Sequence, residues 1–163
     1  MHDLALRALA AADPEPISAA FAAIGWNKPA STYENYLADQ IAGRREVIVA
    51  ELDGRFVGYV TLYWDMPDGV PEVMDLNVLP EFRRRGFATQ MMDEAERRAV
   101  ARSPVVGIGV GMYPDYGPAQ RMYVLRGYVP DGKGLICGTE PVFAGQLVEV
   151  DDDLILHFTK RLE

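Results

Sequence analysis

Hydrophobic residues follow two different spacings along the chain, and the changes from one spacing to the other predict the order of its elements. Spacings of three and four residues favour helices, whereas β-branched and aromatic runs bounded by turn residues favour strands. Helices are predicted over Pro14 to about Gly25, Ser31 to about Gly43, 86–102 and Pro118 to Arg126. Strands are predicted over 3–9, 46–52, 56–64, Glu72 to Val78, 105–110, 135–137 and 154–158.

Short-range signals set several of these boundaries. Asp53-Gly54 separates two β-branched and aromatic runs, which is a strong signal for a β-hairpin. Ser31 followed by Glu34 matches a capping box, so a helix is expected to begin at Ser31. Gly127 is expected to close the last helix.

The β-α-β-α-β order between residue 72 and about 137 predicts the fold class. Helical crossovers join parallel strands, so this stretch requires a locally parallel arrangement, whereas the hairpin before it is antiparallel. A mixed α/β (α+β) sheet of six to seven strands, flanked by about four helices, is expected. The length of 163 residues fits a single domain over 1–163.

The charge balance narrows the class of partner. Asp and Glu number 24 against 16 Lys and Arg, which gives a net charge of −8. Such a field repels a nucleic-acid backbone and attracts a cationic small molecule or peptide, although plain solubility explains the acidity equally well. A cationic partner is therefore favoured, and nucleic acid is not expected.

Other composition signals concern the compartment and metals. The single cysteine, Cys137, cannot form an intramolecular disulfide, which favours a reducing compartment. No apolar run approaches the ~20 residues of a membrane span, and the N-terminus lacks the pattern of a secretion signal, so a cytoplasmic protein is expected. His2 and His157 lack partners at metal-ligand spacing, so both are interpreted as structural and no metal is expected.

The stretch 76–89 carries the clearest candidate chemistry. A β-rich run stops at Pro80, three arginines and Gly86 follow, and an amphipathic helix then begins. Backbone amides at a helix N-terminus, together with nearby cations, suit a pyrophosphate. The expected cofactor-binding residues here are Arg83, Arg84, Arg85, Gly86, Phe87, Ala88 and Thr89.

Two motifs give the chain a family resemblance. Arg83-Arg84-Arg85-Gly86-Phe87-Ala88 matches the pyrophosphate motif Gln/Arg-x-x-Gly-x-Gly/Ala of the GNAT superfamily of acetyl-coenzyme-A-dependent N-acetyltransferases. The run Tyr116 to Tyr128 resembles the family's later helix, with Ala119, Tyr123 and Gly127 in register and Tyr116 in place of the usual asparagine. The resemblance implies the GNAT acyl-CoA N-acyltransferase fold and acetyl-CoA as co-substrate. It adds Leu76, Asn77 and Val78, which match the strand whose main chain contacts the pantetheine arm in the family, and also Tyr116 and Ala119, to the cofactor-binding set.

The resemblance also implies roles in acetyl transfer to a primary amine. Tyr123 would be the general acid, and the main-chain N–H of Val78 would stabilise the oxyanion. Glu72 is the first candidate base, Asp75 the second, and water remains an alternative. Asp75 would face away from Glu72 in a regular strand, but a bulge would reverse that.

The acceptor site is expected between the two N-terminal helices and neighbouring loops, as in the family. Trp26, Tyr33, Trp64 and Tyr113 are the candidate substrate-binding residues, since aromatic rings can hold an ammonium. The identity of the amine stays open. A non-catalytic acetyl-CoA sensor and a transferase for another acyl group are alternatives, and a homodimer is an alternative to a monomer.

Overall fold

A computed structural model describes residues 4–163, and within them the chain forms one mixed sheet with helices on both faces. The described strands are β1 Leu4–Ala8, β2 Arg45–Leu52, β3 Arg55–Tyr63, β4 Glu72–Val78, β5 Val105–Gly111, β6 Val129–Cys137, β7 Glu140–Pro141 and β8 Leu154–Arg161. The helices are α1 Pro14–Ala22, α2 Ala30–Ile41, α3 Phe87–Val100 and α4 Gly117–Leu125, with 3₁₀ turns η1 Pro80–Phe82 and η2 Pro114–Tyr116.

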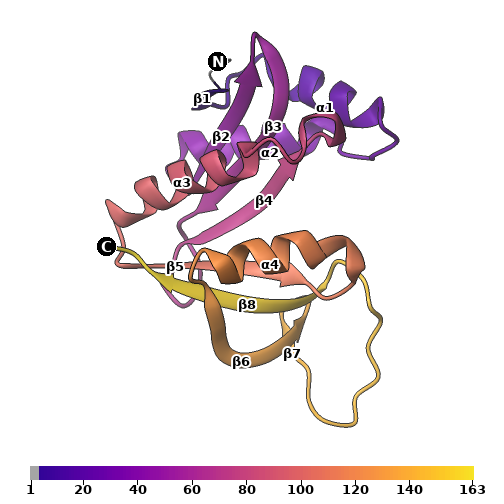
Figure 1. The fold of residues 1–163 in the computed structure, drawn as a ribbon, viewed down its shortest axis with the longest axis vertical. Helices are drawn as coiled ribbons and strands as arrows, with labels where there is room; N and C mark the ends of the chain where they lie inside the picture. The colour runs from indigo at the N-terminus through magenta and orange to yellow at the C-terminus, as the bar shows by residue number, and fades with distance from the viewer. Residues whose placement is uncertain (1–3) are drawn as a thin grey trace.

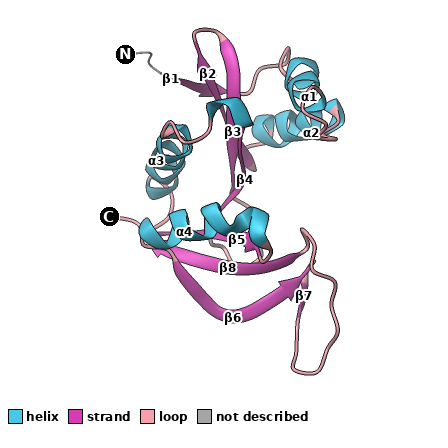
Figure 2. Ribbon diagram, turned by 45° about the vertical axis from the view of Figure 1, so that its right-hand side comes forward, coloured by secondary structure: helices cyan, strands magenta, loops and turns pink. Residues whose placement is uncertain are grey.

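The sheet has the spatial order β1-β2-β3-β4-β5-β8-β6-β7. Neighbouring strands are antiparallel except β4 and β5, which are parallel, as the βαβ order predicted. In Figure 1 the first four strands form the upper half of the molecule, and β5, β8 and β6 form the lower half. Figure 2 shows α1 and α2 on one face of the upper half and α3 on the other. The predicted fold class is confirmed.

Some predicted boundaries differ from the structure. The described part of the sheet has eight strands rather than six or seven, because the two-residue β7 pairs with the end of β6. The start of the strand predicted over 3–9, like His2, lies outside the described residues. The predicted capping box is wrong: α2 begins at Ala30, its N-cap is Pro29, and no side chain caps it. Ser31 is therefore already inside the helix, where its hydroxyl is not at the N-cap position.

The predicted apolar stripe of α3 is confirmed, because Phe87, Met91, Ala95 and Ala99 are all buried. This helix covers the central strands on one face. On the other face, α1 and α2 bury Phe21 and Tyr33, whose rings both meet Tyr59 of β3 edge-on. Within residues 4–163 no helix is both long enough and apolar enough to cross a membrane.

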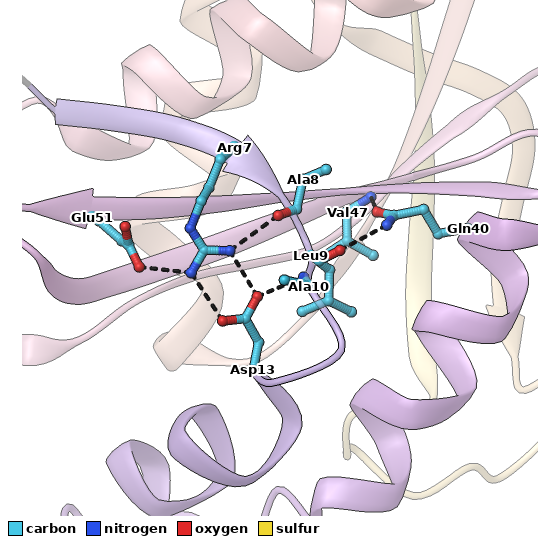
Figure 3. Close-up of polar contacts among 8 residues, drawn as sticks. All are labelled: Arg7, Ala8, Leu9, Ala10, Asp13, Gln40, Val47 and Glu51. Atoms are coloured by element: carbon cyan, nitrogen blue, oxygen red, sulfur yellow. Dashed lines mark hydrogen bonds and ion pairs between the residues drawn. The ribbon is translucent and has the colours of Figure 1, made fainter.

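The edge strand β1 is tied to the rest of the fold by charged groups, which Figure 3 shows. Arg7 donates hydrogen bonds to both carboxylate oxygens of Asp13 and, at 2.7 Å, to Glu51 of β2. The two hydrogen bonds from Arg7 to Asp13 lower the pKa of the Asp13 carboxyl. Gln40 of α2 donates to the carbonyl of Leu9 and accepts from the amide of Val47, so it joins α2 and β2 to the loop that follows β1.

The two halves of the sheet separate where β4 meets β5. These strands pair only at Glu72–Gly107 and Val73–Ile108. Beyond Val73, β4 keeps its antiparallel contact with β3 up to Val78 but has no described partner in β5. The sheet is therefore open between the two central strands beyond Val73.

Candidate active site

The turn between η1 and α3 exposes a row of backbone amides. Arg84 has a φ of 58° and Gly86 a φ of 80°, so the chain passes twice through the left-handed region before α3 begins. Glycine enters this region without penalty, whereas Arg84 is strained there. Among residues 4–163, none accepts a hydrogen bond from the amides of 84–89. These donors, at the positive end of the α3 dipole, form a site for an anion.

A cavity of about 770 Å³ lies in front of these amides, between the end of β4, the start of α3 and α4. Most of the expected cofactor-binding residues line it: Leu76, Asn77, Val78, Arg83, Arg84, Gly86, Phe87, Ala88, Thr89 and Ala119. Pro80, Glu81, Phe82, Pro118 and Met122 complete the wall. The volume lies within the usual range for a small-molecule or cofactor site.

Two expected cofactor-binding residues point elsewhere. The Arg85 guanidinium lies 5.0 Å from the ring centre of Phe87 and does not line the cavity. Tyr116 lies against Gly111 of β5, and its hydroxyl donates to Asp152 over 2.9 Å. A side chain in place of hydrogen at Gly111 would collide with the Tyr116 ring, so the missing Cβ makes room for it.

Arg83 lines the cavity and connects two parts of its surroundings. Its Nε donates to the carbonyl of Val78 over 3.1 Å, and its guanidinium lies 5.5 Å from the ring centre of Trp26. Trp26 stacks on Phe21 of α1 at a centroid distance of 5.7 Å. Arg83 thus connects the anion-binding turn with the segment between α1 and α2.

The main-chain direction at Val78 follows from its neighbour. The amide of Leu79 donates to the carbonyl of Val57 in β3. Successive amides of an extended strand point to opposite edges, so the N–H of Val78 points away from β3, toward the side on which β5 has separated. This geometry is what an oxyanion donor at Val78 requires.

Tyr123 lies on α4, one residue after the cavity-lining Met122, and its side chain is only 5% exposed. Burial raises the pKa of Tyr123 to about 12, so the phenol stays protonated at neutral pH and can only donate a proton. Arg126, at the end of α4, donates to Glu96 over 3.0 Å and to Asp93 over 2.7 Å, both of α3. These bonds hold α4 beside α3.

A β-bulge settles which way Asp75 faces. Thr61 pairs with Met74 and Tyr59 with Asn77, so Asp75 and Leu76 stand opposite one residue of β3. Asp75 has a φ of 54°, a sparsely populated conformation for a residue with a Cβ. It accepts a hydrogen bond of 2.6 Å from the Tyr36 hydroxyl of α2. The bulge therefore turns Asp75 onto the face covered by α2.

Glu72 lies on that same face. Its partner in β3 is Tyr63, whose ring contacts the Arg45 guanidinium, and Arg45 also stacks on Tyr36 of α2. The two candidate bases differ in burial, since the Glu72 side chain is 10% exposed and the Asp75 side chain 37%. Asp75 is additionally 3.9 Å from Arg45.

His157 of β8 is an unexpected member of the site. Its Nε2 lies 3.5 Å from Oε1 of Glu72. The carboxylate raises the pKa of His157 above its ordinary value. Sequence reasoning treated this histidine as structural because no local motif surrounds it. The available signal was the Gly107-Ile108-Gly109-Val110-Gly111 alternation, which leaves one face of a strand without side chains.

The aromatic residues expected at the acceptor site are spread over different surroundings. Tyr33 is fully buried, and its hydroxyl has no hydrogen-bond partner among the described residues. Tyr113 donates, like Tyr116, to Asp152, and together these two bonds lower the pKa of that carboxyl. Trp64 is elsewhere: its ring lies 3.9 Å from the guanidinium of Arg102, which follows α3.

Within the described part of the chain, no group of three or more His, Cys, Asp or Glu side chains is placed to hold a metal ion. Glu72 and His157 are a pair without a third ligand. The site offers anion-binding amides on one side of the opening and carboxylates on the other.

Comparison with known proteins agrees with this arrangement. The family model of the acetyltransferase (GNAT) family matches residues 8–128, which is most of the chain and includes both the amide-rich turn and α4. No curated protein matches the sequence.

Solved structures share the fold at low identity. SpeG, a spermidine/spermine N-acetyltransferase from Vibrio cholerae, is 17% identical with a TM-score of 0.69 over 97% of this chain and 92% of that chain. YncA from Salmonella typhimurium, solved with its cofactor acetyl-CoA, is 18% identical with a TM-score of 0.69 over 98% and 94%. Ard1 from Thermoplasma volcanium is 15% identical with a TM-score of 0.73 over 98% of both chains.

Proposed function

This chain belongs to the acetyltransferase (GNAT) family, and from that premise we propose that it transfers an acetyl group from acetyl-CoA to a primary amine of a small molecule or peptide. The observation that carries the proposal is the row of unpaired amides at 84–89, which faces a cavity at the opening between β4 and β5. Acyl carriers of this kind bear a diphosphate, which is the group that such amides bind.

The residues present fit the coenzyme. The amides of 84–89 and the dipole of α3 would hold the diphosphate, with Arg83 and Arg84 adding positive charge at the cavity wall. The main chain of Leu76 to Val78, which has no partner strand on that side, would hold the pantetheine arm. The coenzyme supplies the activated acetyl group.

The acceptor is proposed to be cationic. Glu72 and Asp75 lie on the face of the sheet covered by α2, Asp152 accepts hydrogen bonds from Tyr113 and Tyr116, and the whole chain carries a net charge of −8. SpeG, one of the solved structures with this fold, is a spermidine/spermine N-acetyltransferase. Trp26 and Tyr113 remain proposed acceptor-site residues, whereas the complete burial of Tyr33 and the position of Trp64 beside Arg102 do not support that role.

Each chemical step has a candidate group. Glu72, with Asp75 or water as alternatives, accepts one proton from the acceptor ammonium. A typical alkylammonium has a pKa near ~10.4, so this step sets how much free amine exists at neutral pH. The N–H of Val78 donates to the carbonyl oxygen as the amine attacks, and one such donor can contribute ~3 kcal/mol. Tyr123 donates its proton to the departing thiolate and regains one from the new amide nitrogen.

Calorimetric titration with acetyl-CoA tests the binding half of this proposal. We expect saturable binding by the wild-type protein and an affinity at least about 100-fold lower for Ala88→Glu, which places a carboxylate beside the amides. Ala101→Glu is the matched control, because it adds the same charge at an exposed site beyond the other end of α3. If the wild-type protein does not bind acetyl-CoA, the proposal fails.

A thiol-release assay tests the transfer half. The panel would contain spermidine, simple alkylamines and a peptide with a free N-terminus. Release of coenzyme A that depends on one of these amines supports an acetyltransferase. Tight acetyl-CoA binding without release to any of the amines would instead favour the sensor alternative.

A further inference from the structure

Resting on the proposed function, we propose that His157 receives from Glu72 the proton that Glu72 takes from the acceptor ammonium, and passes it to solvent. The two residues come from strands β4 and β8, which do not pair with each other. His157 is thus a positioning and proton-accepting partner of Glu72, rather than a structural histidine.

The geometry brings the pair together across β5. Glu72 of β4 pairs with Gly107 of β5. His157 of β8 pairs with Gly109, which is also on β5. Gly107 and Gly109 point to the same side of β5, because they are two residues apart. With only hydrogens there, the Glu72 and His157 side chains meet over the strand at 3.5 Å. A Cβ on Gly109 would lie 3.2 Å from His157 Nε2 and 3.3 Å from Glu72 Oε1.

The two side chains differ in exposure, which indicates the one that exchanges protons more readily with solvent. The Glu72 side chain is 10% exposed, whereas that of His157 is 26% exposed. Glu72 is therefore the more buried member of the pair, next to the point where β4 and β5 separate, and His157 is the member with more contact with solvent. A proton accepted by the inner carboxylate has a short path outward through the imidazole.

The protons balance. Acetylation of an ammonium releases two protons from nitrogen. One protonates the departing thiolate with the help of Tyr123. The other moves from the ammonium to Glu72, then to His157 Nε2, and then to water. The carboxylate and the neutral imidazole are both restored before the next cycle.

The groups around His157 determine the direction of its pH dependence. Glu72 faces it from β4, Asp131 and Lys133 act on it from β6, and β5 offers only Gly109 at this position. The carboxylates favour the imidazolium, and Lys133 and partial burial oppose it; the balance is a raised pKa. Only the neutral imidazole can accept a proton, so turnover should increase as the pH rises through the pKa of His157.

NMR titration of the histidine side chains tests the pair without any acceptor. His157 and His2 give the only two imidazole signals of the chain, and a His2→Gln variant assigns them. We expect the His157 midpoint to fall by at least about 0.5 pH unit in Glu72→Gln, because the neighbouring carboxylate that favours the imidazolium is removed. Glu140→Gln, an exposed glutamate on β7, is the matched control and should leave it unchanged. An unchanged midpoint in Glu72→Gln overturns the proposal.

The pH profile of kcat/KM tests the role in turnover, with acetyl-CoA and the best amine of the panel. In the wild-type protein, the acid limb should coincide with the His157 midpoint. In His157→Gln the limb that the imidazole sets should disappear, and the maximal rate should fall about tenfold, with unchanged acetyl-CoA affinity. A variant with the wild-type limb overturns the inference, while loss of acetyl-CoA binding or turnover by the wild-type protein overturns the proposed function instead.

Discussion

Gly109→Ala should separate the Glu72 and His157 side chains although neither of these residues is replaced. The new Cβ would lie 2.9 Å from Ile155 Cγ2, 3.2 Å from His157 Nε2 and 3.3 Å from Glu72 Oε1. The first distance is too short for any carbon pair, so at least one of the three side chains has to move. Overpacking of this kind typically costs about 1–3 kcal/mol.

Gly107→Ala is the matched control on the same strand and the same face. Its Cβ would meet nothing closer than 3.7 Å, which is ordinary van der Waals contact. Replacing glycine by alanine inside a strand otherwise tends to stabilise, because it removes backbone freedom from the unfolded chain. We therefore expect Gly109→Ala to be less stable than Gly107→Ala by about 1–3 kcal/mol.

Thermal unfolding and histidine titration together check this prediction. For a chain of this size the difference corresponds to about 2–12 °C in Tm. The His157 midpoint should move toward its ordinary value in Gly109→Ala and stay in place in Gly107→Ala. Equal stability and equal midpoints in the two variants would refute the argument that the bare face of β5 accommodates the pair.

Three further outcomes are expected. Tyr123→Phe should lower kcat at least about tenfold while acetyl-CoA affinity by calorimetry stays the same, and unchanged turnover would remove its role as the acid. Gly58→Ala should lower the yield of folded protein more than Gly109→Ala does, because its Cβ would collide with the backbone carbonyl of Asn77, and a normal urea midpoint would contradict this. Hydrogen bonds from two arginines lower the pKa of Glu94 to about 2, so its stabilising effect is complete above about pH 4.5 and is lost as the pH falls toward 2. Urea unfolding of Glu94→Gln should therefore vary less with pH in that window than wild type.

The sequence contained enough local information for most of the fold. The Asp53-Gly54 turn, the apolar stripe of α3 and the βαβ order each depend on neighbours close in the chain, and each is confirmed. The start of α2 was missed because two overlapping signals compete there. Pro29 and Ser31 can both precede a helix, and the chain uses the proline.

The candidate site likewise has one part that the sequence predicts and another part that it does not. The amide-rich turn could be read from 83–89, since strand, turn and helix follow one another in sequence. The Glu72–His157 pair could not, because it depends on β8 lying beside β5, which is a property of the sheet order. The orientation of Asp75 had two alternatives in the sequence. The bulge determines which face Asp75 points to, and no residue type near position 75 predicts a bulge.

The bulge in β4 has a consequence for how this enzyme could diversify. One extra residue divides the strand into a first part that carries Glu72 and Asp75, the proposed bases, and a second part that borders the cavity proposed to hold the coenzyme. Substitution of side chains before the bulge would leave unchanged the main chain after it, which lines the cavity proposed to hold the coenzyme. New amines could thus be recruited by a few substitutions upstream of Leu76, with the shared half of the reaction left intact.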